Sequence, residues 1–360
     1  MSYISKLKLL QVRSHNNVEF EFHNYMNAIV GPNGSGKTTV IESLYTLLLG
    51  SSFKGSLKEM IQNGRDSITA QLEIKTDTTS HSRALKLLQS ADIIQKKWSV
   101  NNKKYAMLPI RERLPVVLFE PDLSRLITGS PSRRRLYIDS ISSQLDIEAA
   151  KALIGFERIV KQRNQLLKHL RSSSNRTSGQ LFVWNTQLAH ASEAIIKARI
   201  EIIDKLQNEI SNYYKKLGGT DDISLIYKST TSTNHNNYGS VLLKQLEENL
   251  SKDLQLGYTT VGPHRDDIAI EINSQPAVER ASRGEIRTIV IALKLLETSL
   301  ISNHSAQYGM SPTLLLDDVL SELDLSHQEK VLDGLKDHQV FITTTDAHAL
   351  TPGVHTIFLE

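Results

Sequence analysis

The sequence predicts an α/β fold whose sheet-forming parts lie at the two ends of the chain, with helices inserted between them. Three observations predict it. Residues 1–75 alternate apolar and polar side chains around one glycine-rich turn. Residues 145–217 instead carry apolar side chains at helical three-and-four spacing. Short apolar runs at 313–316 and 340–343 are typical of buried parallel strands.

The N-terminal part is expected to contain strands around one helix. Alternation predicts strands at 18–22 and 68–74. A short apolar strand, Asn27–Val30, runs directly into the glycine-rich turn, and a buried helix is expected over Val40–Leu49.

The middle of the chain predicts an antiparallel pair of helices, Ile147–Leu170 and Leu188–Leu217, separated by the turn-rich run Ser172–Gly179. Thirty helical residues would reach about 45 Å, far short of a long coiled-coil arm. A polar loop at 229–240 and an amphipathic helix through Leu254 follow. We therefore expect two domains, which are residues 1–120 together with 256–360, and residues 121–255.

Composition excludes several classes of protein. The 360 residues include no cysteine, so disulfides and thiol-rich metal sites are excluded, which fits a reducing cytoplasm. No stretch approaches the roughly 18 to 20 apolar residues that a membrane span needs, and the N-terminus alternates like a strand rather than a signal peptide. The formal net charge is only +3, so nucleic-acid binding would need a local basic surface.

The glycine-rich turn matches the phosphate-binding P-loop pattern, with a strand before it and a helix after it. Its glycines let backbone N–H groups point at phosphate oxygens, and the positive end of the following helix adds to this. The flanking elements disfavour the alternative of a chance glycine-rich turn. The expected nucleotide-binding residues here are Gly31, Pro32, Asn33, Gly34, Ser35, Gly36, Lys37, Thr38 and Thr39. Lys37 would reach the β- and γ-phosphates, and Thr38 would hold Mg²⁺.

A second acidic motif supports this site. The apolar strand Leu314–Leu316 ends in Asp317 and Asp318. Asp317 would lie at the Mg²⁺ beside the P-loop, and Asp318 would polarise the attacking water. An ordinary strand end is the alternative, which the P-loop makes less favourable.

Ser282 opens an apolar helix together with Arg283, Gly284 and Glu285. One interpretation is a capping box, in which Ser282 caps the helix and Glu285 reaches back. The other is the signature motif of ABC ATPases, where such a helix start faces the γ-phosphate bound by another subunit. The two interpretations are compatible, because a capped start still offers N–H groups, a dipole and a hydroxyl.

The order of these motifs resembles that of ABC ATPases, with Ser321–Glu322–Leu323–Asp324 similar to their D-loop. Further segments resemble the RecF family of SMC/Rad50-like proteins. They are Pro121–Asp122, Leu126–Pro131, Arg134–Arg135, Tyr137–Asp139, Val261–Asp267 and Thr343–Asp346. The resemblance implies an α/β fold with an ABC-type P-loop ATPase head, an inserted helical second lobe and no long coiled coil.

The resemblance also implies a function. Members of this family are ATP-controlled dimers that bind gapped DNA at single-strand/double-strand junctions and act with RecR and RecO to load RecA. Each of two nucleotide sites would combine Lys37 and Asp317 of one chain with Ser282 and Gly284 of the other, using ATP and Mg²⁺. Such a protein would work in the cytoplasm, at the nucleoid. Arg13 and Arg65 lie in segments that approach the nucleotide in this family; a plain surface pairing is the alternative.

Two departures from the ABC pattern matter. Arg283 stands where transporters usually have glycine, and Asp318 stands where many ABC ATPases have glutamate. The shorter side chain of Asp318 implies slow hydrolysis, as expected for a switch. No switch histidine is evident, and Thr345 and Asp346 occupy that region.

Two other functions compete. An energising subunit of a membrane transporter would have fewer residues between the P-loop lysine and the signature serine than this chain has between Lys37 and Ser282. An ATP-binding scaffold with little turnover differs from the switch only in its rate.

Two basic stretches could contact DNA. Arg133, Arg134 and Arg135 form the densest cluster, which could bind phosphates or could pair with Asp139. Lys96, Lys97, Lys103 and Lys104 surround Trp98 and Tyr105, and predict either a solvated hairpin or a DNA-facing edge. His264 lacks companion residues at metal-ligand spacing, so we expect a structural or nucleotide-relay role for it.

Overall fold

The computed structural model describes residues 2–90, 93–172, 179–231, 237–346 and 353–360. The chain forms two compact units, unit 1 (Met1–Leu123 with Glu297–Glu360) and unit 2 (Ser124–Leu296). The first boundary lies close to the predicted one at 120/121. The second lies well beyond the predicted 255/256, because the segment after 256 belongs to the helical unit.

The physical reason for this difference is a set of contacts made by residues 258–272. The strand Asp267–Ile272 pairs with Ile223–Lys228 within unit 2. Thr259 donates from its amide and its hydroxyl to Asn164 Oδ1, each at 2.8 Å. These contacts hold the segment to the helices rather than to the head.

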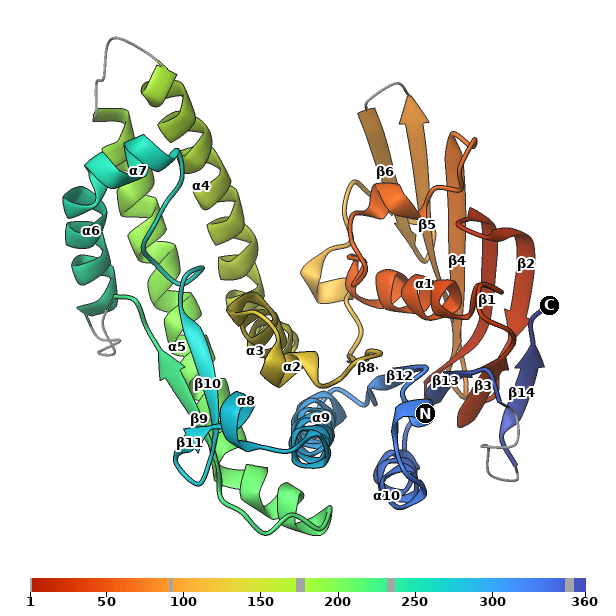
Figure 1. The fold of residues 1–360 in the computed structure, drawn as a ribbon. Coiled ribbons are helices and arrows are strands. Elements are labelled where there is room, and N and C mark those ends of the chain that lie inside the picture. Colours follow the sequence, from red (N-terminus) through yellow and green to blue (C-terminus); the bar gives the residue numbers. More distant parts are fainter. Residues whose placement is uncertain (1, 91–92, 173–178, 232–236, 347–352) are drawn as a thin grey trace. The chain divides into compact units, whose positions relative to one another are not determined.

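Unit 1 contains a six-stranded antiparallel sheet in the order β2-β1-β4-β5-β6-β7 (Figure 1). Its strands are β1 (Tyr3–Val12), β2 (His15–Glu21), β4 (Ser67–Lys75), β5 (Ser80–Ser90), β6 (Ile93–Val100) and β7 (Lys103–Tyr105). The predicted hairpin around Trp98 is confirmed as β6 and β7. Positive φ angles at Asn101 and Asn102, 47° and 66°, suit its two-residue turn.

The second sheet of unit 1 is parallel, in the order β14-β3-β13-β12-β8. Its strands are β3 (Met26–Val30), β8 (Val116–Phe119), β12 (Thr313–Asp317), β13 (Val340–Thr344) and β14 (His355–Phe358). The central strands β12 and β13 are buried throughout, as their unbroken apolar runs predict.

Helix α1 (Lys37–Leu49) contacts strands of both sheets and completes the core of unit 1. Its buried side chains include Val40, Ile41 and Leu44, which share one cluster with Leu9 of β1 and Phe341 of β13. Gly50 ends the helix in the left-handed region, with φ 88°. The glycine-rich turn is therefore fixed between a buried strand and a buried helix.

Shorter elements complete unit 1. They are the 3₁₀ turns η1 (Leu57–Met60), η2 (Ile110–Glu112) and η4 (Leu320–Glu322), and the helix α10 (Leu325–Leu335). Asp324 caps α10, because its carboxylate accepts from His327 N at 3.0 Å.

Unit 2 is built on the predicted helical pair, α4 (Ile147–Ser172) and α5 (Gly179–Lys216), which lie side by side in Figure 1. At 38 residues, α5 is about 57 Å long and starts earlier than predicted. The other helices are α2 (Arg125–Thr128), α3 (Pro131–Leu145), α6 (Tyr238–Glu248), α7 (Leu250–Leu256) and α8 (Ala277–Arg280). A three-stranded sheet contains β9 (Ile223–Lys228), β10 (Asp267–Ile272) and β11 (Gln275–Pro276).

Helix α9 (Arg283–Ala306) crosses the boundary between the units after Leu296. Its first residues, which carry the predicted signature, belong to unit 2. Within the described parts of the chain, no helix is both long and apolar enough to span a membrane.

Candidate functional site

The glycine-rich turn between β3 and α1 has a backbone that only glycine adopts easily. Gly34 and Gly36 have φ angles of 89° and 95°. A Cβ on Gly36 would also lie 2.6 Å from Ser14 Oγ and 2.5 Å from His15 Nε2. The hairpin between β1 and β2 therefore packs directly against the last residue of the loop.

Lys37 is buried at the start of α1, with 4% of its surface exposed. Its Nζ donates to the carbonyl oxygens of Gly31 at 2.8 Å and Pro32 at 3.1 Å. The ammonium group therefore lies inside the loop that is predicted to bind the phosphates. A phosphate oxygen could replace one of these carbonyls and gain a charge-assisted hydrogen bond.

Thr38 and Asp317 are brought together although they are far apart in sequence. Thr38 Oγ1 donates to Asp317 Oδ1 at 2.9 Å. Strand β13 lies between β3 and β12, and Thr343 on it donates from Oγ1 to the same Oδ1 at 2.9 Å. One carboxylate oxygen of Asp317 is therefore fixed by two hydroxyl groups.

The other oxygen of Asp317 is buried and has no hydrogen-bond partner among the described residues. Burial raises the pKa of Asp317, and the hydrogen bonds from Thr343 and Thr38 oppose this. The unpaired carboxylate oxygen of Asp317 and the nearby hydroxyl of Thr38 are both oxygen donors, the type of ligand that Mg²⁺ prefers. The residues present fit the predicted magnesium site.

Asp318 follows in a left-handed conformation with φ 51°. Its amide nitrogen donates to Thr343 Oγ1 at 2.8 Å, and its carbonyl accepts from Ser321 Oγ at 2.7 Å. Strained backbone of this kind is concentrated at functional sites. The side chain is half-buried, at the end of the strand that carries Asp317.

Arg13 is half-buried and pairs with a fully buried carboxylate, which differs from the plain surface pairing that the sequence left open. Its Nε and Nη2 donate to the two carboxylate oxygens of Glu42 at 2.6 and 2.9 Å. Glu42 lies on α1 and has no exposed surface. Arg65 is exposed, in a turn where its amide donates to the carbonyl of Gln62 at 3.0 Å.

Ser282 forms the predicted capping box at the start of α9. Its amide donates to Glu285 Oε2 at 2.7 Å, and Glu285 N donates to Ser282 Oγ at 3.3 Å. Hydrogen bonding of its carboxylate to the side chain and the backbone amide of Ser282 lowers the pKa of Glu285. Ser282, Arg283 and Gly284 are exposed, and a Cβ on Gly284 would meet no described atom within 4 Å. The start of this helix is thus open to a second molecule.

The arginine cluster on α3 has structural partners within unit 2. Arg134 donates from Nε and Nη2 to the two oxygens of Asp267, at 2.8 and 3.0 Å, and from Nη1 to two backbone carbonyls. Arg135 Nη1 donates to the carbonyl of Asp266 at 2.6 Å. Arg133 is half-buried. Arg134 and Arg135 therefore follow the structural-pairing interpretation, with partners other than Asp139, and DNA contact by the cluster stays a prediction.

Asp139 was considered as the structural partner of these arginines, but it pairs elsewhere. Arg199 on α5 donates to its two carboxylate oxygens at 2.7 and 2.8 Å. Arg199 Nη1 also donates to the carbonyl of Pro263 at 2.7 Å. These bonds hold the segment Val261–Asp267 against α3 and α5, which gives that segment a structural role.

His264 belongs to the same segment and is buried. Its Nε2 lies 3.1 Å from the carbonyl oxygen of Thr259. Burial lowers the pKa of His264 to about 4; the Thr259 carbonyl raises it, and Arg265 and Arg135 lower it further. The imidazole is therefore neutral near pH 7.

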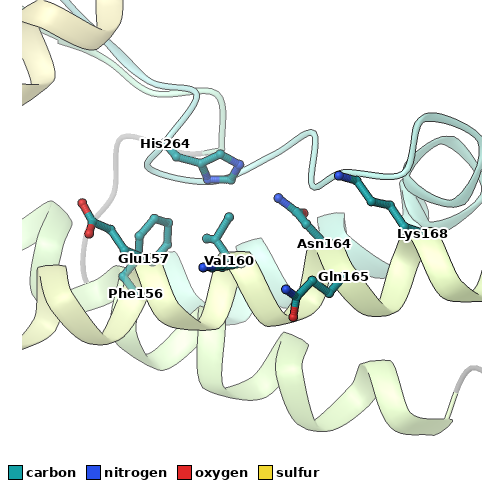
Figure 2. Close-up of a pocket in the computed structure, with 8 residues that line it drawn as sticks. Phe156, Glu157, Val160, Asn164, Gln165, Lys168 and His264 are labelled. Atoms are coloured by element: carbon teal, nitrogen blue, oxygen red, sulfur yellow. The ribbon is translucent and has the colours of Figure 1, made fainter. Parts of the chain in front are cut away.

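A cavity of about 460 Å³ lies between His264 and one side of α4. Figure 2 shows Phe156, Val160 and Asn164 of α4 beneath the histidine ring, with Lys168 further along. None of the predicted nucleotide-binding residues lines this cavity. It is distinct from the phosphate site.

The lysine face is an exposed basic surface formed by Lys86, Lys97 and Lys104 on the side of the antiparallel sheet away from the core. Lys86 of β5 lies directly opposite Lys97 of β6, and Lys104 of β7 lies opposite Ser99. All three lysines are exposed. Like charges directly opposite each other destabilise a sheet unless an anion offsets them.

Three residues at the site were not identified from the sequence as contributors. The sequence marks Thr343 only as part of the segment Thr343–Asp346, and it assigns no role to His15 or Glu42. His15 Nε2 lies 3.2 Å from the carbonyl oxygen of Gly36. A charged residue within the apolar run of α1 was the available signal for Glu42.

Comparisons with known proteins agree with this architecture. The family model described as RecF/RecN/SMC N terminal domain matches residues 3–357. A protein named DNA replication and repair protein RecF from Ruminiclostridium cellulolyticum is 32% identical over 356 residues, covering 95% of this chain and 92% of its own. The protein of the same name from Clostridium perfringens is 31% identical over 352 residues, covering 97% of this chain and 94% of its own.

Solved structures show the same likeness. The recombination mediator protein RecF with ATP, described within the RecFOR pathway, superposes with a TM-score of 0.85 at 27% identity, covering 99% of this chain and 95% of that chain. An SMC head bound to the C-winged helix domain of ScpA gives a TM-score of 0.52 at 17% identity over 96% of this chain and 90% of that one, a likeness of fold. The predicted head fold and family are confirmed, and the chain belongs to the RecF family of the RecF/RecN/SMC ATPase group.

Proposed function

We propose that this protein is an ATP-dependent switch that dimerises on ATP, binds gapped DNA and releases it after slow hydrolysis. The observation that carries the proposal is the cluster of Lys37, Thr38 and Asp317 at the P-loop, in which one buried oxygen of Asp317 has no described partner. The proposal is also supported by the relative that was solved with ATP.

In this proposal each nucleotide-binding residue has a distinct role. The amides of Gly31–Gly36 and the start of α1 bind the phosphates, and Lys37 neutralises the β- and γ-phosphates. Thr38 and Asp317 hold Mg²⁺, which supplies positive charge between the phosphates. Thr343 keeps Asp317 oriented. The other loop residues, Pro32, Asn33, Ser35 and Thr39, shape the turn.

Dimerisation is proposed to complete the site. The exposed amides at the start of α9, together with Ser282 and Gly284, would contact the γ-phosphate bound by a second copy. ATP would then join the two chains, because only a triphosphate reaches both. Arg283 would lie at the same contact.

Asp318 is proposed to orient the attacking water. Its backbone is fixed through Thr343, but aspartate is one methylene shorter than the glutamate of many ABC ATPases, so the rate would be low. An ATP-binding scaffold with almost no turnover is the second candidate, and this short side chain is the observation that favours it.

DNA is proposed to bind at the lysine face. Two chains would offer six lysines, and binding to phosphates releases counterions and depends strongly on salt. The exposed and mutually opposed positions of Lys86 and Lys97 support this proposal. Partners RecR and RecO, with RecA downstream, are proposed from family membership, as is action in the cytoplasm at the nucleoid.

The test is DNA binding by fluorescence anisotropy on a gapped duplex, with Mg²⁺ and either ATP or ADP, across a range of salt. Binding is expected with ATP and much weaker binding with ADP. The double variant Lys97→Gln, Lys104→Gln should flatten the salt slope by about 4 for a dimer.

The matched control is Lys96→Gln, Lys103→Gln. It changes the neighbouring residues of the same two strands, which alternate to the other side of the sheet. This control should keep its salt slope. If the salt slope flattened equally in both variants, or in neither, the lysine face would not be the DNA-binding surface. Equal DNA affinity with ATP and ADP would contradict a nucleotide-dependent switch.

A further inference from the structure

A buried glutamate lies behind the phosphate site, and nothing in the proposed chemistry uses it. Glu42 is the one acidic residue of α1 and has no exposed surface. It accepts two hydrogen bonds from Arg13 in a bidentate pair, and Ser52 Oγ donates to Oε1 at 2.5 Å. A buried carboxylate must be paired and hydrogen-bonded to be tolerated, so Arg13 is held firmly.

Arg13 is held close to the P-loop. The next two residues, Ser14 and His15, pack so closely against Gly36 that a Cβ added there would clash with both side chains. Glu42 follows Thr38 by four residues on α1, so the two lie on one face of the helix, one turn apart. Helical side chains lean toward the N-terminus, which brings Glu42 and its arginine toward Thr38.

The backbone at Arg13 is also constrained. Its φ of 47° lies in the left-handed region, which costs energy for a residue with a side chain. Its amide donates to the carbonyl of Met60 at 3.0 Å. The turn is therefore fixed from its backbone and its side chain together.

We infer that Glu42 is a positioning residue that holds Arg13 beside Gly36 and Thr38, and so sets the preference for a nucleoside triphosphate over a diphosphate. This inference rests on the proposed ATP site. Arginine has five N–H donors, and the pair with Glu42 uses two of them. The charge of Arg13 is offset by Glu42, but its remaining N–H donors would be offered toward the Mg²⁺ residue Thr38. The added γ-phosphate of ATP would accept hydrogen bonds from these donors, and ADP lacks that group.

Ser52 supports the same arrangement from the other side. Its hydroxyl shares Oε1 of Glu42 with Arg13 Nη2. The bond limits rotation of the carboxylate, so loss of Ser52 should loosen Arg13 without removing its partner.

The experiment is a double-mutant cycle on the full chain with Arg13→Ala, Glu42→Gln and the two combined. ATP and ADP affinities are measured by calorimetry with Mg²⁺, at concentrations where light scattering shows a monomer. Each single variant should lower the ratio of ATP to ADP affinity about tenfold. The double variant should lower it no further, because Glu42 acts through Arg13.

A purely structural role predicts a different result. Glu42→Gln would then lower the melting temperature but leave the ATP-to-ADP ratio unchanged, or its effect would add to that of Arg13→Ala. Either outcome overturns the inference. Ser52→Ala serves if Glu42→Gln does not fold, with an expected loss of about two- to threefold in the ratio, and an unchanged ratio overturns the inference.

Failure of the proposed function is distinguishable from failure of this inference. Lys37→Met tests the ATP site alone. If the unmodified chain binds ATP through Lys37 while Glu42→Gln keeps its ratio, only the inference fails. If ATP binds as well after Lys37→Met, the proposed ATP site itself fails.

Discussion

The ammonium group of Lys37 is held by the carbonyls of Gly31 and Pro32 at the distances that a phosphate oxygen would occupy. A buried cation whose hydrogen-bond partners among the described residues are neutral carbonyls gains most from an anion that replaces one of them. The side chain is therefore arranged for phosphate before any nucleotide binds.

Lys37→Met should abolish ATP binding, because it keeps the length of the side chain and removes the charge. We expect the affinity to fall by at least a hundredfold, from the loss of charge-assisted hydrogen bonds to phosphate. Calorimetry with Mg²⁺ and ATP measures it, and far-UV circular dichroism controls for folding. Tight binding by the folded variant would remove Lys37 from the site.

His264 should make stability depend on pH. Burial holds its folded pKa at about 4, below the unfolded value of 6.5. Between these values the unfolded chain binds a proton that the folded chain does not, so acid favours unfolding. The stabilisation is complete above pH 6.5 and decreases as the pH falls toward 4, by about 2 kcal/mol between pH 7 and pH 5.

Urea unfolding of the unmodified chain and of His264→Gln, each at pH 7 and pH 5, measures this contribution. The variant cannot titrate, so its stability should fall by about 2 kcal/mol less over the same range. His15 and His338, whose pKa values burial also lowers, remain in both proteins and cancel in the comparison. Equal pH dependence in the two proteins would mean that His264 is accessible to protons in the fold.

At the scale of elements, the strand order explains why the phosphate site forms. Strand β13 separates β3 from β12, and Thr343 on β13 lies opposite Asp317 in register. The hydroxyl thereby links β13 to the acidic strand β12, while the backbone of β13 pairs with the P-loop strand β3. The sequence predicted both flanking strands and their motifs, but it carried no information on this register, so the role of Thr343 could not be predicted.

Helix α3 shows a second limit of the sequence. Three consecutive arginines predict a basic surface, but Arg134 pairs with Asp267, which is remote in sequence and close only in the fold. The start of α5 was placed too late for a similar reason. Its early residues Phe182 and Val183 are apolar but exposed. They therefore do not fit the three-and-four spacing of buried apolar residues from which the helix was predicted.

Arg134→Met should therefore destabilise unit 2 rather than weaken DNA binding. Removing a mostly buried partner of Asp267 is expected to cost about 3 kcal/mol. Lys97→Met makes the same chemical change at an exposed site and should alter stability by less than about 0.5 kcal/mol. Urea unfolding and the salt slope of DNA binding, measured on both variants, separate the two roles. A flatter slope at unchanged stability for Arg134→Met would restore the DNA-contact interpretation.

For the whole molecule, the predicted arrangement of a split head with inserted helices is confirmed, because long periodic segments determine it. The domain boundary predicted at 255/256 was wrong, because two hydrogen bonds to remote helices decide it: Thr259 donates to Asn164, and the carbonyl of Pro263 accepts from Arg199. The predicted signature at Ser282 therefore belongs to the helical unit. A site completed by two chains would join this unit of one chain to the P-loop of another.

The most direct test of this account is the mass in solution of the Asp318→Asn protein, measured by light scattering with Mg²⁺ and either ATP or ADP. Slow hydrolysis in this variant should preserve the ATP state, and Ser282→Arg in the same background is the control that should stay monomeric. The account predicts a monomer with ADP and twice that mass with ATP. The same mass with both nucleotides would contradict the claim that ATP joins two copies of the chain.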